Sequence, residues 1–380
     1  MIKVVSVVSN DIVTDNRVHK IALSLEANGY RVTVIGRELK DSQKRLNRPY
    51  FVRRFRLIFN KGPLFYLNLN IRIFFYLLFS DTRIILSNDL DTLLSCTLAA
   101  RLKKKQLVFD SHELFPEVPE LVNRPGVRRT WKLLEKKLVS KVRFGFTVSP
   151  SIADFYFDSY GVKFELIRNL GSFRYDTEFE NINRSGSQNT ILYQGALNLG
   201  SGLELLIESM QYIDGAVLQI IGTGDVAPQL KKFTKKLHLE NKVRFLGRLP
   251  LERLWEYTAS ASIGISLEEN LGLNYQYALP NKLFDYIQAR IPVIISDLPE
   301  MTRIVKKYRI GKILVERTPE KLADLINEML SKNFIKKNYA SNLELAAREL
   351  CWEREENKLI RLFRRASDPT WEDTYEESGL

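Results

Sequence analysis

Short apolar runs alternate with helical patterns along most of this chain, and no other feature constrains the fold as strongly. In the first half the apolar runs cover residues 4–8, 32–35, 84–86, 107–109 and 146–148. A second series covers residues 191–193, 216–221, 243–246, 263–266 and 293–295. Strands separated by helices indicate βαβ units and parallel sheets. We therefore expect an α/β protein with two Rossmann-like, doubly wound domains in series.

The alternation stops between residues 168 and 189, where the sequence is polar and rich in Gly. Such a segment is typical of an interdomain link. We predict a first domain over residues 1–170, a linker over 171–189 and a second domain over 190–345. Ligands of doubly wound sheets bind beyond the carboxyl ends of the strands, so we expect the active site in a central cleft that both domains face.

Length and cysteine content bound the class of protein. The 380 residues suffice for two domains with large cores. Cys96 and Cys351 lie in apolar helical patterns, which indicates small buried side chains in a reducing compartment. The first ten residues predict a strand rather than a signal peptide, so we expect a cytoplasmic protein.

Residues 65–80 are the most apolar stretch of the chain. They are fewer than the about 20 residues of a membrane span and contain Arg72, so we predict a buried helix.

The net charge of +12 is concentrated in the first half of the chain. Residues 1–170 hold 29 basic and 16 acidic side chains, whereas residues 171–380 hold 28 and 29. Residues 124–143 contain eight basic side chains, one acid and an apolar stripe at helical spacing. Such a helix can lie on an anionic lipid surface, or it can pack on the core and leave a basic face in solvent. Nucleic acid is not predicted as a partner, because no recognisable binding module accompanies the charge.

Residues 268–297 contain the most informative local pattern. Pro280 is suited to the first turn of a helix, which therefore begins near Asn281. Lys282 and Asp285 then share one face, near the exposed amides and the positive end of the helix. Amides and lysine can bind a phosphate, and the carboxylate can accept hydrogen bonds from a diol. A nucleotide-sugar presents both groups. The alternative is a capped amphipathic helix with Asp285 in solvent.

Two further motifs could carry chemistry. His112 follows the strand at residues 107–109, where it can donate to a leaving phosphate or an incoming hydroxyl, with Glu113 as a companion. A capping role for His112 is the alternative, and His19 and His238 are predicted to be structural. Residues 222–227 match the dinucleotide fingerprint, but the acid expected after the next strand is absent, which argues against NAD. NADP stays formally open.

The segment LPNKLFDYIQARIPVI resembles the donor site of the retaining GT-B glycosyltransferases of family four, also called group 1. In that family a Glu, seven residues and a second Glu bracket the sugar and the ribose. Asp285 stands where the second Glu would be, and Glu268 and Glu269 are candidates for the first. The DSHE segment is also similar to the family, and the resemblance implies a catalytic role for His112. It further implies a GT-B fold whose closing helix, residues 346–365, crosses back to the first domain. The composition of residues 366–380, which are acidic and contain no base, predicts a mobile tail.

The resemblance also implies further contacts and one departure. Relatives often have basic residues that pair with the donor diphosphate at the two positions that Ala196 and Ser201 occupy here, so Lys282 would take over that role. Near the N-terminus the DNRV segment is similar to a pattern whose arginine approaches the cleft. The implied donor-binding residues, in addition to Lys282 and Asp285, are Asn281, Gly195, Gly222, Gly224, Arg248, Leu249 and Asn274. The implied contacts to phosphate or acceptor are Arg17, Asn16 and Glu113.

The resemblance implies a transferase of the hexosyl type that acts in polysaccharide biosynthesis. It would move a sugar from a nucleotide-sugar to a hydroxyl of a glycan or lipid-linked saccharide, with retention of configuration and without metal or cofactor. We expect a cytoplasmic protein, peripheral on the inner face of the membrane if residues 124–143 bind it. The alternatives are a non-catalytic glycan- or nucleotide-binding subunit, which Ala196 and Ser201 favour, and an NADP oxidoreductase.

Overall fold

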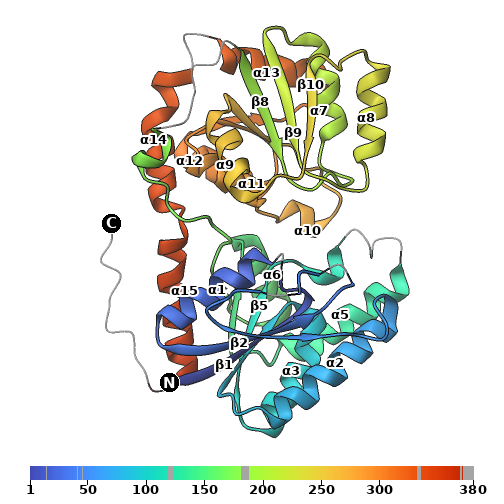
Figure 1. Cartoon of the computed structure of the whole chain (residues 1–380), viewed down its shortest axis with the longest axis vertical. Helices are drawn as coiled ribbons and strands as arrows, with labels where there is room; N and C mark the ends of the chain where they lie inside the picture. Colours follow the sequence, from blue (N-terminus) through green and yellow to red (C-terminus); the bar gives the residue numbers. More distant parts are fainter. Residues whose placement is uncertain are drawn as a thin grey trace. The chain divides into compact units, whose positions relative to one another are not determined.

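The computed structural model describes residues 1–13, 15–40, 42–44, 46–118, 121, 124–180, 188–331, 335–368 and 370. Residues 181–187 of the predicted linker and residues 371–380 of the predicted tail lie outside this part. The chain divides into two compact units, one formed by Met1–Asn169 with Glu355–Leu380 and one by Leu170–Arg354. Each unit contains one sheet with helices on both faces, as Figure 1 shows.

The sheet of the first unit has seven strands in the order β3-β2-β1-β4-β5-β6-β7, and every neighbouring pair is parallel. Its strands are β1 (Ile2–Asp11), β2 (Tyr30–Arg37), β3 (Phe51–Phe55), β4 (Ile84–Asn88), β5 (Gln106–Ser111), β6 (Phe144–Thr147) and β7 (Glu165–Leu166). Most side chains of the central strands are buried because helices cover both faces, which explains the continuous apolar runs in the sequence.

Two helices of the first unit begin at residues whose side chains cap them. Asp15 caps α1 by accepting a hydrogen bond from the amide of Val18, and Ser149 caps α6 in the same way. The helices are α1 (Asn16–Ala27), α2 (Gly62–Phe79), α3 (Leu90–Leu102), η1 (Phe115–Glu117), α5 (Pro125–Val139) and α6 (Pro150–Tyr160). The chain rejoins this unit within α15 (Trp352–Ser367), where Phe363 packs on Tyr30. The helix therefore includes residues 366 and 367, which were predicted to belong to the tail.

The prediction of a buried helix over residues 65–80 is wrong for one face of α2. Four side chains are buried against the sheet, those of Phe65, Leu69, Ile73 and Leu77. The opposite face is apolar and exposed. In the described part of the chain, α2 is the one helix long and apolar enough to cross a membrane, judged by length and composition. In α5 the predicted apolar stripe is also incompletely buried, because Val127 is exposed although Leu138 reaches the core.

The sheet of the second unit has six strands in the order β10-β9-β8-β11-β12-β13, again with parallel neighbours. Its strands are β8 (Asn189–Gln194), β9 (Ala216–Ile221), β10 (Val243–Gly247), β11 (Ile263–Ser266), β12 (Val293–Ser296) and β13 (Gly311–Leu314). The other elements are η2 (Asp176–Phe179), α7 (Leu203–Ser209), η3 (Met210–Tyr212), α8 (Ala227–Lys236), α9 (Leu251–Ser260), α10 (Leu273–Gln276), α11 (Asn281–Gln288), α12 (Pro299–Tyr308), α13 (Pro319–Leu330) and α14 (Ile335–Glu349). The order reverses between β8 and β11, and the carboxyl ends of these strands form the edge from which the polar groups described next extend.

Candidate functional site

A chain of hydrogen bonds holds Asp285 at the carboxyl edge of the second sheet. Gln194 ends β8, and its side-chain amide donates to Oδ2 of Asp285 over 2.8 Å. The hydroxyl of Thr258 in turn donates to Oε1 of Gln194 over 2.7 Å, which orients the amide. Asp285 lies one turn into α11, which begins at Asn281 as predicted. The carboxylate is therefore held in one orientation by side chains from β8 and α9.

Lys282 forms a largely buried ion pair with Glu268. Its Nζ lies 2.6 Å from Oε1 of Glu268, and both side chains are almost fully covered. The hydroxyl of Ser266 donates to the other carboxylate oxygen over 2.7 Å. Nζ also lies 4.2 Å from the centre of the Tyr193 ring. Burial opposes the charge on Lys282, but the Glu268 carboxylate outweighs it, so the pKa of Lys282 is raised.

Of the two candidate glutamates, only Glu268 contacts Lys282 through its carboxylate. Glu269 is more exposed, and one of its oxygens lies 3.9 Å from the guanidinium of Arg317. Arg317 precedes α13 and donates to the carbonyl of Leu267 over 3.0 Å. This arginine anchors the loop that carries both glutamates, and no motif in the sequence had indicated it.

Two glycine turns border this cluster. A Cβ on Gly222 would lie 1.8 Å from the carbonyl oxygen of Gly195, and Gly222 has a φ of +145°. A Cβ on Gly224 would lie 2.3 Å from the carbonyl oxygen of Leu197. The loops after β8 and β9 therefore touch, and glycine is required there for packing. Gly195 itself lies next to Lys282, whose Cε would be 3.2 Å from an added Cβ.

The remaining donor residues predicted from the sequence lie on neighbouring elements. Asn281 is exposed at the start of α11, and Asn274 is half-buried in the short helix α10. Arg248 is exposed directly after β10, where the half-buried Leu249 packs on the core of the unit.

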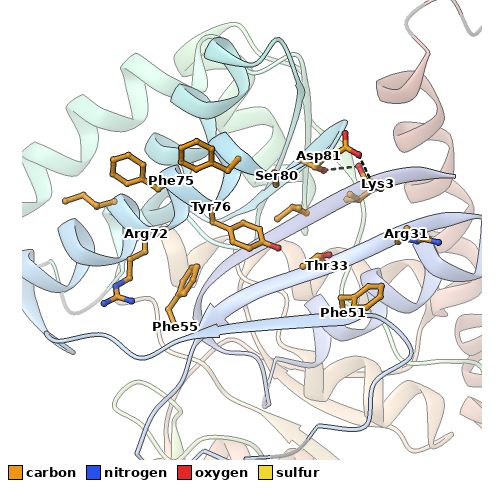
Figure 2. A pocket seen from close by; sticks show the side chains of 15 residues that line it. Lys3, Arg31, Thr33, Phe51, Phe55, Arg72, Phe75, Tyr76, Ser80 and Asp81 are labelled. Atoms are coloured by element: carbon orange, nitrogen blue, oxygen red, sulfur yellow. Dashed lines mark hydrogen bonds and ion pairs between the residues drawn. The ribbon is translucent and has the colours of Figure 1, made fainter.

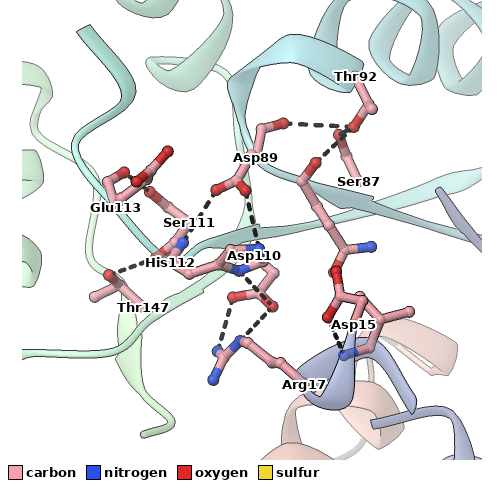
Figure 3. A network of polar contacts seen from close by, with 12 residues as sticks. Asp15, Arg17, Ser87, Asp89, Thr92, Asp110, Ser111, His112, Glu113 and Thr147 are labelled. Atoms are coloured by element: carbon pink, nitrogen blue, oxygen red, sulfur yellow. Dashed lines mark hydrogen bonds and ion pairs between the residues drawn. The ribbon is translucent and has the colours of Figure 1, made fainter. Parts of the chain in front are cut away.

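The first unit holds a second polar cluster, which Figure 3 shows at the ends of β4 and β5. Nε2 of His112 lies 2.9 Å from Oδ2 of Asp89, and Nδ1 lies 3.2 Å from Oδ2 of Asp110. Burial disfavours a charged imidazole, but the two carboxylates outweigh it and raise the pKa of His112 well above its ordinary value. His112 is therefore a charged donor, and 24% of its side chain is exposed.

The resemblance implied that Arg17 contacts phosphate or acceptor, but in the structure its guanidinium is paired with Asp110. Its side chain is 4% exposed, and its Nε and Nη2 each donate to an oxygen of Asp110 over 2.8 Å. Burial raises the pKa of Asp110, but Arg17 and His112 outweigh it and hold that pKa at about 2. Arg17 thus keeps Asp110 charged and in place. Asn16 is exposed beside it, and the carbonyl of Glu113 accepts a hydrogen bond from Ser111.

Asp89 and Asp91 complete the cluster. Asp89 has a φ of +60°, a conformation that is costly for a residue other than glycine. Its neighbour Asn88 fixes the strand end by donating to the carbonyl of Val7 over 2.9 Å. Burial raises the pKa of Asp91 to about 7, and the charge of Asp89 adds to this effect. Asp89 directly follows β4, and Asp110 lies at the end of β5, just before His112. Their positions at strand ends are a signal in the sequence that could have identified both aspartates as candidate site residues.

The two clusters belong to different units, so the structure brings together Lys282 with Glu268, Asp285 with Gln194, and His112 with Asp110. Among the described residues, no group of three or more His, Cys, Asp or Glu side chains is arranged to hold a metal ion. The chemistry available in the second unit is a lysine, a fixed carboxylate and the amides at the start of α11. The first unit offers a charged imidazole held by two carboxylates.

Two family models together match most of the chain. The model described as glycosyl transferases group 1 matches residues 175–349, and the model of glycosyltransferase family 4 matches residues 15–169. No curated protein sequence matches.

Solved structures of other proteins have a similar fold. Sucrose-phosphate synthase from Thermosynechococcus elongatus is 17% identical, with a TM-score of 0.79 over 97% of this chain and 100% of that chain. HepE from Anabaena in complex with UDP and glucose is 14% identical, with a TM-score of 0.72 over 96% and 100%. WaaG, a glycosyltransferase involved in lipopolysaccharide biosynthesis, is 14% identical, with a TM-score of 0.68 over 94% and 99%. At such low identities the likeness shows the fold, and the predicted fold class is confirmed.

Proposed function

Because the chain belongs to the GT-B glycosyltransferases of group 1 and family four, we propose that it transfers a sugar from a nucleotide-sugar to a hydroxyl of a glycan or lipid-linked saccharide. In this proposal the sugar is a hexose, the anomeric configuration is retained, and neither a metal nor a cofactor takes part. The observation that carries the proposal is the polar cluster around Lys282 and Asp285 in the second unit.

Asp285 is the group that we assign to the ribose diol. A carboxylate can accept up to about four hydrogen bonds, so Asp285 can accept from two neighbouring hydroxyls in addition to Gln194. The bonds from Thr258 to Gln194 and from Gln194 to Asp285 fix the orientation of the carboxylate before the donor arrives. A preorganised acceptor of this kind binds a diol with a smaller loss of side-chain entropy.

Lys282 is the cation that we assign to the diphosphate. It lies beside Gly195, in the loop where Ala196 takes the place of a basic residue. The diphosphate would replace the Glu268 carboxylate as the partner of the Lys282 ammonium group. The ammonium group would then keep an anionic partner when the donor binds. As the sugar leaves, Lys282 and the amides at the start of α11 would stabilise the charge that develops on the diphosphate. An oxygen of the departing diphosphate would then help to deprotonate the acceptor on the same face of the sugar.

His112 acts in this proposal as a fixed positive charge. Both of its nitrogens contact carboxylates, so it is not suited to accept a proton from the acceptor hydroxyl. Its positive charge can instead attract an oxygen of the donor sugar or of the leaving phosphate, while Asp89 and Asp110 hold the ring in place.

The first test measures donor binding by calorimetry with a panel of nucleoside diphosphates and nucleotide-sugars. Asp285→Asn should weaken binding by about 1.5 to 3 kcal/mol, because charge-assisted hydrogen bonds to the diol are lost. Lys282→Ala should weaken binding of the diphosphates and abolish transfer. Asp324→Asn, an exposed acid on α13, is the matched control and should bind like the wild type. If a folded Asp285→Asn variant also binds like the wild type, Asp285 is not in the donor site.

Turnover separates the enzyme from a non-catalytic subunit of the same fold. The wild type should transfer or slowly hydrolyse the nucleotide-sugar that binds best, and the coupling constant of the anomeric proton in the product should report retention. A wild type that binds a nucleotide-sugar tightly but neither transfers nor hydrolyses it, with any acceptor offered, would favour the binding subunit. Ser201→Arg would then gain diphosphate affinity without activity.

A further inference from the structure

The exposed face of α2 forms a continuous apolar stripe in the first unit. The exposed side chains recur at helical spacing and are Leu64, Leu67, Ile71, Phe75 and Phe79. Phe79 is 83% exposed and Leu67 is 57% exposed. The 18 residues of the helix contain no acid and one base, Arg72. At 1.5 Å per residue the stripe from Leu64 to Phe79 is roughly 22 Å long, which is far more than an isolated surface hydrophobe requires.

An open groove of about 750 Å³ runs along the C-terminal half of α2, beside strands β1 to β3. Aromatic rings form much of its wall, including Phe51, Phe55, Phe75, Tyr76 and Phe79. Figure 2 shows Arg72 and Arg31 at opposite sides of the groove. Neither arginine forms an ion pair with a residue that the structure describes. The groove includes Lys3 and Arg31, at the amino ends of β1 and β2, so it lies at the sheet edge opposite to the one that holds His112.

Basic side chains also surround the C-terminal end of α2. Phe79 shares a second hollow with Arg83, Lys103 and Lys104, the last two of which are exposed. Lys105 donates to the carbonyls of Leu77 and Ser80, so its ammonium group stabilises the end of α2. An exposed aromatic side chain between free lysines provides both an apolar contact and an attraction for anions. This pairing matches the interface of a membrane that carries anionic lipid headgroups.

We propose that the α2 surface, defined as the exposed stripe of α2 with the groove beside it, docks the protein on an anionic phospholipid bilayer. The apolar stripe lies at the level of the acyl chains, the groove receives part of one acyl chain, and Arg31, Arg72, Lys103 and Lys104 contact headgroup phosphates. The helix lies on the bilayer and does not cross it. Asn70 bonds to the carbonyls of Tyr66 and Asp91, and one face of α2 is part of the core, so a spanning helix would require unfolding of the unit.

The test is co-sedimentation of the full chain with vesicles of phosphatidylcholine, with and without phosphatidylglycerol. We expect the wild type to bind the anionic vesicles and to be released by salt. Phe75→Ser combined with Phe79→Ser should lower the partition coefficient at least about ten-fold, because two exposed rings lose their contact with lipid. Phe157→Ser, an exposed phenylalanine on α6, is the matched control and should bind like the wild type. Far-ultraviolet circular dichroism and nucleotide affinity should be unchanged in both variants.

A second pair of variants locates the cations that matter. Arg72→Gln should lower binding to anionic vesicles about five-fold, and Lys136→Gln with Lys137→Gln on the exposed face of α5 should have less effect. The proposal is overturned if the α5 variant loses binding while the Phe75 and Phe79 variant keeps it, because α5 is then the docking element. It is also overturned if the wild type binds no vesicle, or if the two phenylalanines instead prove to hold a dimer in analytical ultracentrifugation.

Discussion

At the scale of single residues, the charge on His112 determines what the first unit can contribute. The imidazole faces Asp89 and Asp110, the second of which is itself held by Arg17, whereas burial raises the pKa of the nearby Asp91 to about 7. Because the pKa of His112 is raised, the ring keeps its proton through neutral pH. The ion pairs contribute stability that is fully present below the ordinary histidine pKa of about 6.5 and is lost as the pH rises through the folded value.

This charge predicts the kinetics of a His112→Gln variant. The catalytic constant should fall by about 10²-fold or more, whereas donor affinity should change much less, because the interaction is made mainly in the transition state. His238→Asn is the control, since His238 is exposed, distant in sequence and has a φ of +56°, which Asn tolerates. A His112→Gln variant with normal turnover would return the residue to a purely structural role.

The pH profile tests the same charge independently. The wild-type rate should stay level through pH 6.5 and fall only in an alkaline limb, where His112 loses its proton. Asp89→Asn removes one of the two facing carboxylates and should move that limb to lower pH. A limb that lies near pH 6.5 in the wild type, or that does not move in Asp89→Asn, would show that these carboxylates do not control the titration.

At the scale of elements, the close approach of two loops positions the donor site. The turn after β8 contains Gly195, and the turn after β9 contains Gly222, whose amide donates to the carbonyl of Gly247 over 2.8 Å. The two turns pack so closely that no Cβ fits at Gly222. This packing is sufficient to require glycine at positions 222 and 224.

Gly222→Ala should therefore be much more costly than another glycine substitution at positive φ. Gly215 has a φ of +71° but nothing within 4 Å of an added Cβ, so Gly215→Ala should cost only about 1 kcal/mol of unfolding free energy. Gly222→Ala carries the same kind of backbone strain plus a clash and should lower both stability and donor affinity. Urea denaturation and calorimetry measure the two effects. Equal stability losses in the two variants would mean that the loops separate without cost.

At the scale of the whole molecule, the two units have separate cores. One buried cluster includes Leu192, Ile265 and Ile294 in the second unit, and another includes Val5, Ile35 and Leu69 in the first. Large proteins with separate cores often unfold in more than one step. The residues that we assign to the ribose and the diphosphate, Asp285 and Lys282, both lie in the second unit, so a bound nucleotide should act on the stability of that unit first.

Differential scanning calorimetry should accordingly resolve more than one transition. A nucleotide at 100 times its dissociation constant should add about 2.7 kcal/mol to the unfolding free energy of the second unit. Hydrogen exchange should show the added protection in strands β8, β11 and β12 and in α11. Protection that falls mainly on strands β1 to β7 would contradict the placement of the donor site.

Local patterns in the sequence were enough to predict the two parallel sheets and the start of α11. Apolar periodicity and the position of Pro280 depend on residues within a few positions of one another, and helices and buried strands form from such neighbours. The placement of His112 after a strand was also visible, because a parallel sheet directs every carboxyl end to the same edge.

Only the tertiary structure decided the partners of these residues. Gln194 and Asp285 are 91 positions apart in the sequence, and Arg17 and Asp110 are 93 apart. Their pairing depends on the strand order, which brings distant strand ends together. The same holds for α2, which has apolar side chains on both its buried and its exposed face, so its sequence could not show which face the sheet covers. Contacts of this kind depend on how the elements pack, and the periodicity of one segment contains no information about the surface of another.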